Sequence, residues 1–176
     1  DIKPLIDTVL PIAPPDETYS SQNVAYSIIS DVVHSATNQD YQTLINNKIF
    51  VPLNMQHASI DFETMNNNSN IAIPHLYAGK GLWKSQKLNS RYYTVAPASG
   101  VNASISDLAN WLKALLGSYP EFVSESTLEE IFTPQIYTPI KRKFRRSWKN
   151  LDSLYYGLGW RIFKTNGENI IYHGGY

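Results

Sequence analysis

The sequence predicts an α+β fold. Two observations indicate it: apolar residues recur at helical spacing in four segments between residues 22 and 132, and the last 20 residues resemble a β-hairpin. An irregular, strongly basic stretch separates these two regions. We therefore expect four helices, then a basic loop, then a terminal antiparallel hairpin that pairs into a larger sheet.

Residues 1–20 are predicted to form an extended approach segment. Pro14 and Pro15 close it, because proline lacks a backbone N–H and biases the preceding residue away from helix. Asp1, Asp7 and Pro11 interrupt its apolar residues, so it does not have the apolar core of a signal peptide. No segment of the chain approaches the roughly 20 apolar residues of a membrane span, and we expect no transmembrane segment.

Two helices are predicted next, over residues 23–34 and 39–50. In the first, two adjacent rows of apolar residues repeat every four positions and form a wide stripe that should face the core. These rows are Val24, Ile28 and Val32, and Ala25, Ile29 and Val33. The second helix places Tyr41, Leu44, Ile45 and Ile49 inward and ends before Pro52.

The helical period is lost between residues 54 and 100. The asparagine-rich run at residues 66–70 is predicted to be a surface loop, because short polar side chains compete for backbone hydrogen bonds. Around it, residues 71–76 and 91–96 are predicted to be short strands.

A third helix is predicted from Ser104, an N-cap residue followed three positions later by Asp107, to Gly117. A fourth, over about residues 125–132, starts at Ser124 and stops before Pro134. The apolar face of the third helix consists of Leu108, Trp111, Leu112, Leu115 and Leu116.

The basic stretch has six Lys or Arg among residues 141–149, together with Phe144 and Trp148. Such a pattern occurs in patches that bind nucleic acids or anionic membranes, but also in solvated loops. Because the 15 basic and 15 acidic residues of the chain balance, we favour the solvated loop and expect no nucleic acid partner.

The terminal hairpin is predicted from residues 158–164 and 168–173, which flank Asn166-Gly167, a strong signal for a tight turn. This organisation divides the chain into residues 1–20, a mainly helical domain at 21–150, and a hairpin at 151–176 that belongs to an incomplete sheet domain. An exposed sheet edge is normally covered. We therefore expect the remaining part of its own chain, or a partner, to complete the sheet.

Composition excludes several kinds of chemistry. The chain has no cysteine, so it has no thiolate metal site, thiol nucleophile or disulfide. The four histidines, His34, His57, His75 and His173, are scattered singly, and no phosphate-binding glycine loop is present. We expect no metal and no cofactor.

Two short motifs remain, each with two interpretations. Ser21 and Asn23 flank the start of the first helix, where either would serve as an N-cap, and composition alone favours that role. His173, Gly174 and Gly175 form either a simple glycine turn or a place where a ligand approaches the backbone closely beside a hydrogen-bond donor.

The order of five motifs resembles the serine β-lactamase and penicillin-binding-protein superfamily, specifically its class C β-lactamase, DD-peptidase and esterase branch. The likeness covers nearly the whole chain and implies a β-lactamase/transpeptidase-like fold. The motifs are residues 14–26, similar to Pro-Pro-Gly followed by Tyr-x-Asn; 49–55, similar to Ile-Phe-x-Pro-Leu-Gly-Met; 97–108; 156–160, Tyr-Gly-Leu-Gly-Trp; and 173–175, His-Gly-Gly.

This resemblance implies acyl transfer by a serine that a lysine activates in a Ser-x-x-Lys turn. By position, Ser21 would supply a proton-shuttling hydroxyl and Asn23 a substrate-holding amide. His173 would face the substrate carboxylate, with Gly174 and Gly175 keeping the strand open. The backbone N–H of Tyr176 would be one of two oxyanion donors.

The sequence departs from the pattern at two places. Ser21 stands where this branch normally has Tyr, with Tyr19 two residues earlier, and no Ser-x-x-Lys occurs anywhere in the 176 residues. We therefore expect a fragment of a serine hydrolase whose nucleophile lies upstream, acting on β-lactams, D-alanyl peptides or small esters. The alternative is a catalytically inactive member with a binding or structural role. The resemblance also implies a periplasmic or secreted protein with a small-molecule or peptide substrate.

Overall fold

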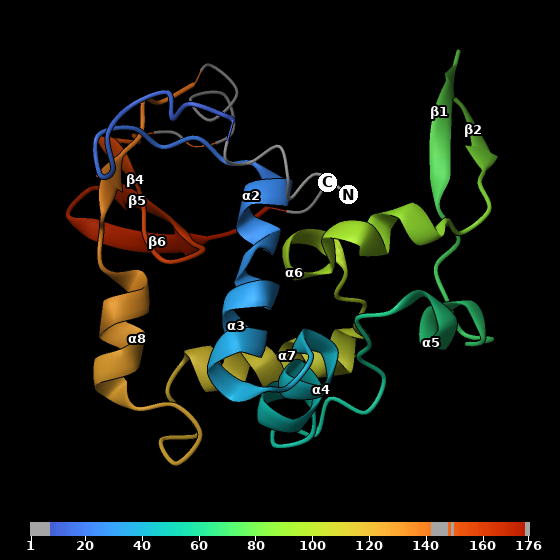
Figure 1. The fold of residues 1–176 in the computed structure, drawn as a ribbon. Coiled ribbons are helices and arrows are strands. Elements are labelled where there is room, and N and C mark those ends of the chain that lie inside the picture. The colour runs from blue at the N-terminus through green and yellow to red at the C-terminus, as the bar shows by residue number, and fades with distance from the viewer. Residues whose placement is uncertain (1–7, 142–147, 149, 175–176) are drawn as a thin grey trace. The chain divides into compact units, whose positions relative to one another are not determined.

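The structure is a computed structural model that describes residues 8–141, 148 and 150–174. It combines helices with antiparallel sheets and confirms the predicted α+β fold (Figure 1). The chain forms two compact units: a helical unit, Ser21–Phe122, and a sheet unit made of Asp1–Ser20 and Val123–Tyr176. The domain boundaries expected from the sequence, at residues 20 and 150, stay a prediction.

The first predicted helix forms as two short helices, α2 (Asn23–Ser27) and α3 (Ile29–Thr37), joined at Ile28. Asn38 ends α3 in the left-handed conformation, with φ of 54°, which asparagine tolerates better than most residues. The predicted apolar stripe is only partly buried: Val32 is 56% exposed and Ile29 39%. The reason is that α2 packs on α6 (Ala96–Ser99) and η2 (Ser90–Val95), and α3 on α4 (Tyr41–Ile45), which leaves the remaining side of the stripe uncovered in this unit.

The second predicted helix is confirmed as α4 (Tyr41–Ile45), which continues into a π-helical segment, η1 (Asn46–Phe50). Its N-cap is Asp40, whose carboxylate accepts a hydrogen bond from the backbone N–H of Thr43 at 2.8 Å. Beyond η1 the chain turns at Asn54, with φ of 53°. That position corresponds to the glycine of the family motif.

The middle of the helical unit differs from the prediction. After α5 (Phe62–Asn66) come β1 (His75–Gly79) and β2 (Leu82–Ser85), an antiparallel hairpin. The strand predicted at 71–76 was therefore wrong for all but its last two residues. The strand predicted at 91–96 was wrong altogether, because η2 (Ser90–Val95) is a 3₁₀ helix followed by α6 (Ala96–Ser99).

Local capping explains the second error. The Asn89 side chain accepts a hydrogen bond from the backbone N–H of Arg91 at 2.9 Å, which starts a helical turn where β-branched and aromatic residues favoured a strand. A short apolar run does not distinguish the two conformations by its period.

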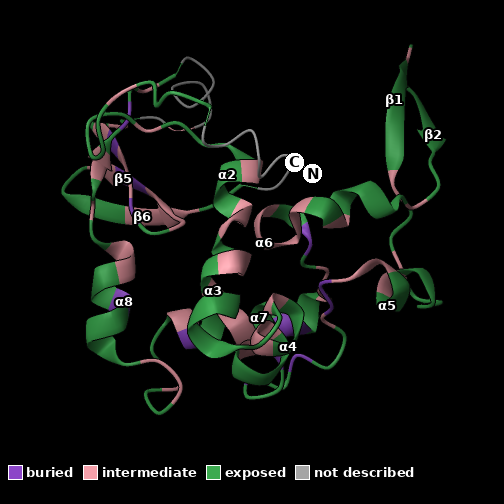
Figure 2. Ribbon diagram, in the orientation of Figure 1, coloured by how far each residue is buried: buried purple, intermediate pink, exposed green. Residues whose placement is uncertain are grey.

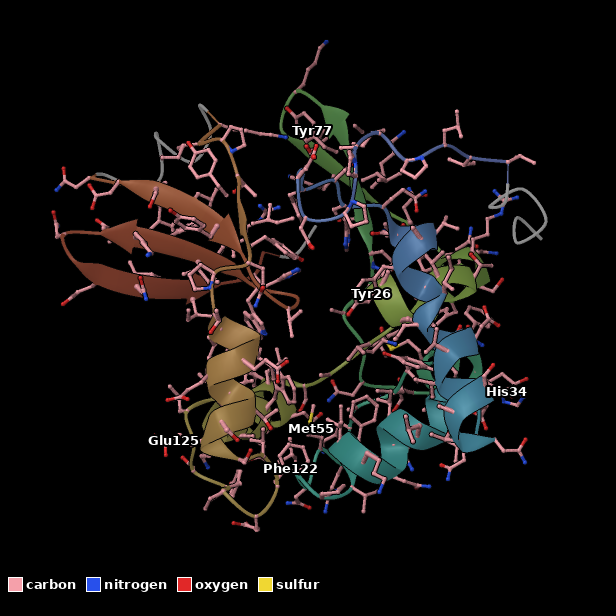
Figure 3. All side chains as sticks on the ribbon, turned by 60° about the vertical axis from the view of Figure 1, so that its left-hand side comes forward. Tyr26, His34, Met55, Tyr77, Phe122 and Glu125 are labelled. Carbon is pink, nitrogen blue, oxygen red and sulfur yellow. The ribbon has the colours of Figure 1, made fainter. Side chains whose placement is uncertain are left out.

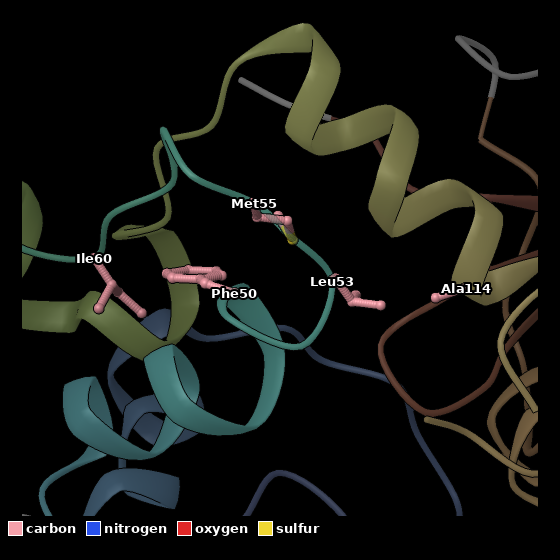
Figure 4. Close-up of a cluster of buried hydrophobic side chains, with 5 residues drawn as sticks. All are labelled: Phe50, Leu53, Met55, Ile60 and Ala114. Carbon is pink, nitrogen blue, oxygen red and sulfur yellow. The ribbon is translucent and has the colours of Figure 1, made fainter. Parts of the chain in front are cut away.

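The third predicted helix is confirmed as α7 (Ile105–Leu115), with a complete capping box between Ser104 and Asp107. Together with the turns after η1 it builds the core of the helical unit (Figure 4). The buried side chains of that core are Phe50, Leu53, Met55, Ile60 and Ala114.

The sheet unit contains the fourth predicted helix, α8 (Glu125–Phe132), and a four-stranded antiparallel sheet in the order β3-β4-β5-β6. The strands are β3 (Ile136–Tyr137), β4 (Ser153–Tyr156), β5 (Arg161–Thr165) and β6 (Glu168–Tyr172). The predicted hairpin is confirmed as β5–β6. Asn166 and Gly167 both have positive φ, 50° and 81°, as the tight hairpin turn requires.

The sheet has its own small core. Leu154 of β4 and Ile162 and Phe163 of β5 are almost fully buried. Exposed residues, green in Figure 2, predominate in both units. The ring of Trp148 packs edge-on against Phe163, with 4.9 Å between ring centres. Most of the basic stretch at 141–149 lies outside the described residues. Among all the residues that the structure describes, no helix is long and apolar enough to cross a membrane.

Candidate functional site

The start of α2 has an unexpected cap. The side-chain oxygen of Gln22 accepts a hydrogen bond from the backbone N–H of Ala25 at 2.7 Å, and Gln22 is the N-cap residue. Ser21 and Asn23 on either side of it are exposed. Within the described part of the chain, neither of their side chains makes a hydrogen bond. Capping therefore does not account for the serine and the asparagine, the two residues that sequence patterns alone assigned to it.

Tyr19, the alternative to Ser21, is packed within the sheet unit. Its ring stacks on the ring of Tyr156 with 4.1 Å between centres and 29° between planes. The guanidinium carbon of Arg161 lies 5.5 Å from the centre of the Tyr19 ring and 5.6 Å from that of Tyr156. These distances are those of stacking and cation–π contacts, so Tyr19 is held by β4 and β5.

His173 follows the last residue of β6 and is exposed. Its ring meets the edge of the Trp160 ring, with 6.2 Å between centres and 82° between planes. Trp160 ends the Tyr-Gly-Leu-Gly-Trp motif, where the backbone N–H of Gly157 donates to the carbonyl of Trp160 at 2.8 Å. The fold thus brings the fourth and fifth motifs together within the sheet unit.

Gly157 and Gly174 each leave little room for a side chain. A Cβ on Gly157 would be 2.8 Å from the carbonyl oxygen of Ile131 and 3.0 Å from that of Thr133, which are backbone atoms that cannot easily move. A Cβ on Gly174 would be 2.8 Å from the hydroxyl of Tyr172, a side-chain atom. Gly175 and Tyr176 lie outside the described residues.

The site residues predicted from the sequence therefore fall into two groups. Ser21 and Asn23 stand together at the start of α2 in the helical unit, and His173 and Gly174 stand together after β6 in the sheet unit. Sequence patterns missed two contributors: Gln22 as the cap and Trp160 as the neighbour of His173. The Ser-Gln-Asn and Tyr-Gly-Leu-Gly-Trp runs were the signals that contained them.

Asp107 is the most buried charged residue in the described ranges, with 2% of its surface exposed. Burial raises the pKa of its carboxyl, but hydrogen bonds from Ser104 and from the backbone N–H of His57 outweigh it, so the pKa lies below its usual 3.8. Its two oxygens accept from the Ser104 backbone N–H at 3.0 Å, the Ser104 hydroxyl at 2.8 Å and the His57 N–H at 3.4 Å. This carboxylate is a structural group rather than a general acid or base.

The helical unit also has a pocket of about 360 Å³ beside η1. None of its lining residues is charged or nucleophilic; they are Asn46, Phe50, Val51, Asn54, Met55, Gln56 and Ala58. Over the residues that the structure describes, no group of three His, Asp or Glu side chains is placed to hold a metal ion. The candidate residues assigned from the motifs are the Ser21 hydroxyl, the Asn23 amide and the His173 imidazole.

Comparisons with known proteins agree with this arrangement of motifs. The sequence matches the family described as Beta-lactamase over residues 5–176. It is 26% identical over 168 residues to Protein flp of Staphylococcus aureus, covering 92% of this chain and 29% of that protein. It is 25% identical over 174 residues to Unguisins hydrolase ungD' of Aspergillus campestris, covering 93% of this chain and 30% of that protein. The chain thus spans less than a third of the length of these curated relatives.

Solved structures share the fold. The octameric penicillin-binding protein homologue from Pyrococcus abyssi superposes with a TM-score of 0.74 at 22% identity, over 91% of this chain and 34% of that one. A D-stereospecific amidohydrolase from Streptomyces superposes with a TM-score of 0.69 at 19% identity, over 96% and 46% of the two chains. Because the family match covers almost the whole sequence and the fold agrees, the chain belongs to the β-lactamase family, within the serine β-lactamase and transpeptidase-like superfamily.

Proposed function

We propose that the chain is part of a serine hydrolase of the class C β-lactamase type, which forms an acyl-serine intermediate on β-lactams, D-alanyl peptides or small esters. The observation that carries this proposal is the exposed pair of Ser21 and Asn23 at the start of α2. Neither of these side chains caps the helix, because Gln22 is its N-cap residue. Membership of the β-lactamase family supports the reaction class.

In this proposal each residue has a defined role. The Ser21 hydroxyl passes a proton between the nucleophile and the leaving group, and the Asn23 amide holds the substrate carbonyl. His173 donates a hydrogen bond to the substrate carboxylate, with its ring set by the edge contact to Trp160. Gly174 and Gly175 leave room for the substrate backbone, and the Tyr176 N–H stabilises the oxyanion.

The nucleophile and its general base come from outside these 176 residues, because no Ser-x-x-Lys occurs among them. The strands β3 and β6 form the two edges of the sheet. We accordingly propose that further residues of the same protein, or a partner, complete the sheet and supply the nucleophile. A periplasmic or secreted location is proposed on the family resemblance.

Ser21 is preferred to Tyr19 as the proton-shuttling hydroxyl. The Tyr19 ring is held within the sheet unit by its stack on Tyr156 and by the Arg161 guanidinium, whereas Ser21 is exposed. Within the described residues, the Ser21 side chain makes no hydrogen bond.

The relatives suggest which substrates to test first. The solved neighbours include a D-amino acid amidase from Ochrobactrum anthropi and the D-stereospecific amidohydrolase. Amides with D configuration, such as D-alanyl-D-alanine peptides and D-phenylalanine amide, are therefore the first substrates, followed by β-lactams and short-chain esters.

A non-catalytic family member is the second candidate, and the serine in place of the family tyrosine favours it. The full reading frame that contains these residues separates the two. We expect a fluorescent penicillin to label the full-length protein covalently, and a Ser21→Ala variant to be acylated or deacylated at least tenfold more slowly. An intact Ser-x-x-Lys without labelling or turnover of any of these substrates would establish the binding role.

A further inference from the structure

The hairpin β1–β2 exposes four large apolar side chains in the helical unit. Figure 3 shows where one of them, Tyr77, lies. Tyr77, labelled there, lies on the hairpin and well away from Met55 in the core of the same unit. Four large apolar side chains on its two strands are about three-fifths exposed: Leu76 at 62%, Tyr77 at 59%, Leu82 at 63% and Trp83 at 63%. Contiguous exposed apolar residues of this kind mark a contact surface.

The hairpin tip is a tight turn at residues 79–81. Gly79, Lys80 and Gly81 have φ of 89°, 49° and 77°, and the backbone N–H of Gly81 donates to the Tyr77 hydroxyl at 3.1 Å. Tyr77 and Trp83 are directly opposed across the strands, with 5.3 Å between ring centres. The tip therefore presents two packed aromatic rings on one face, with Leu82 on a neighbouring strand position.

The charge around this hairpin is one-sided. No Asp or Glu occurs between Glu63 and Asp107, whereas the hairpin and the segment after it carry Lys80, Lys84, Lys87 and Arg91. All four cations are exposed. The chain as a whole has no net charge, so this local excess is a property of the segment and fits an anionic surface.

We propose that the β1–β2 hairpin binds the headgroup region of an anionic lipid bilayer. Tyr and Trp side chains favour the boundary between water and lipid, and lysines near the surface are attracted by anionic headgroups. The tip enters this region so that both strand faces contact lipid, while Lys80 and Lys84 extend their long side chains to the phosphates. The proposal is independent of the hydrolase activity.

Vesicle co-sedimentation of the chain tests it. With phosphatidylcholine vesicles that contain phosphatidylserine we expect salt-sensitive binding, and with pure phosphatidylcholine at least tenfold weaker binding. Each lysine replaced by glutamine should weaken binding about fivefold, and the triple variant Lys80→Gln, Lys84→Gln, Lys87→Gln about 100-fold. Failure of the unmodified chain to bind anionic vesicles would overturn the proposal.

A matched pair of double variants tests the location. Leu82→Ala with Lys84→Gln removes one exposed leucine and one lysine from the hairpin, and Leu112→Ala with Lys113→Gln removes the same from α7, where Leu112 is 55% exposed. We expect roughly tenfold or greater weakening for the hairpin pair and little change for the α7 pair. Equal effects, or binding that depends only on the basic residues at 141–149, would place the contact elsewhere.

Quenching by brominated lipids distinguishes a bilayer from a soluble polyanion. Trp83 fluorescence should be quenched, and Trp83→Phe should abolish most of the quenching while the other three tryptophans remain. Binding that heparin reproduces, without quenching of Trp83, would identify the hairpin as a polyanion site and contradict the membrane proposal.

Discussion

Asp107, at the first turn of α7, accepts a hydrogen bond at 3.4 Å from the backbone N–H of His57, a residue 50 positions earlier. The same carboxylate completes the capping box with Ser104. One buried side chain therefore both starts a helix and fixes the turn that carries core residues Met55 and Ile60 against it.

Replacing Asp107 with alanine should lower the free energy of unfolding by about 2–4 kcal/mol. The change removes the Asp107 half of the capping box, worth about 1 kcal/mol, and leaves the partly buried backbone N–H groups of Ser104 and His57 without this acceptor. Urea denaturation measures it. Asp40→Ala is the matched control, since Asp40 also caps a helix but is exposed, and it should lower the free energy of unfolding by less than Asp107→Ala does. Equal losses would show that the contact to His57 contributes nothing.

Acid should weaken the fold partly through the same residue. The pKa of Asp107 lies below its usual 3.8, because hydrogen bonds from Ser104 and His57 overcome the effect of burial. The folded state therefore favours the carboxylate, and this stabilisation is complete above pH 3.8 and is lost as pH falls through the lower folded pKa. Denaturation midpoints measured across this range should fall less for Asp107→Asn than for the wild type. Parallel curves would contradict the assignment.

Sequence patterns predicted correctly those elements that several local signals indicate together. The α7 helix combines a cap, an apolar face and a closing glycine, and the β5–β6 hairpin combines strand-forming residues with Asn166-Gly167. The misassigned segments lack that redundancy. Residues 91–96 have strand-like composition, but a side chain outside them, Asn89, starts a helical turn. Strands β3 and β4 were missed because both are short, with two and four residues, and β3 forms only by pairing with β4 across the basic stretch.

The candidate site stays a prediction from motif order. Ser21, Asn23 and His173 were assigned from residue types and spacing, which are properties of the sequence. The cap formed by Gln22 and the edge contact between Trp160 and His173 depend on side-chain geometry, which no pattern of residue types specifies.

Gly157→Ala should destabilise the sheet unit by about 1–3 kcal/mol. The added methyl group would press on the backbone oxygens of Ile131 and Thr133, which can move only if α8 and the strand after it shift. Gly174→Ala is the comparison, because its methyl group meets side-chain atoms of Tyr172 rather than backbone oxygens and should cost less. Thermal unfolding of both variants tests this, and a larger effect at Gly174 would refute it.

Tyr19→Ala should detach the N-terminal segment from the sheet unit. It removes the stack on Tyr156 and one contact of the Arg161 guanidinium, together worth about 1–3 kcal/mol. Tyr19→Phe keeps the ring and should be nearly neutral. Limited proteolysis should cleave residues 8–20 faster in the alanine variant only. If the phenylalanine variant is cleaved as fast as the alanine variant, the Tyr19 hydroxyl, rather than the ring stack, holds the segment.

Stability measurements on three adjacent residues decide whether Ser21 and Asn23 are available for chemistry. Gln22→Ala removes the observed cap of α2 and should cost about 0.5–1 kcal/mol, measured by urea denaturation and by faster hydrogen exchange at the Ala25 amide. Ser21→Ala and Asn23→Ala should each change stability by less than about 0.5 kcal/mol, because neither side chain forms a hydrogen bond within the described residues. If either variant loses as much stability as Gln22→Ala, that side chain serves the fold, and the proposed catalytic role loses its main support.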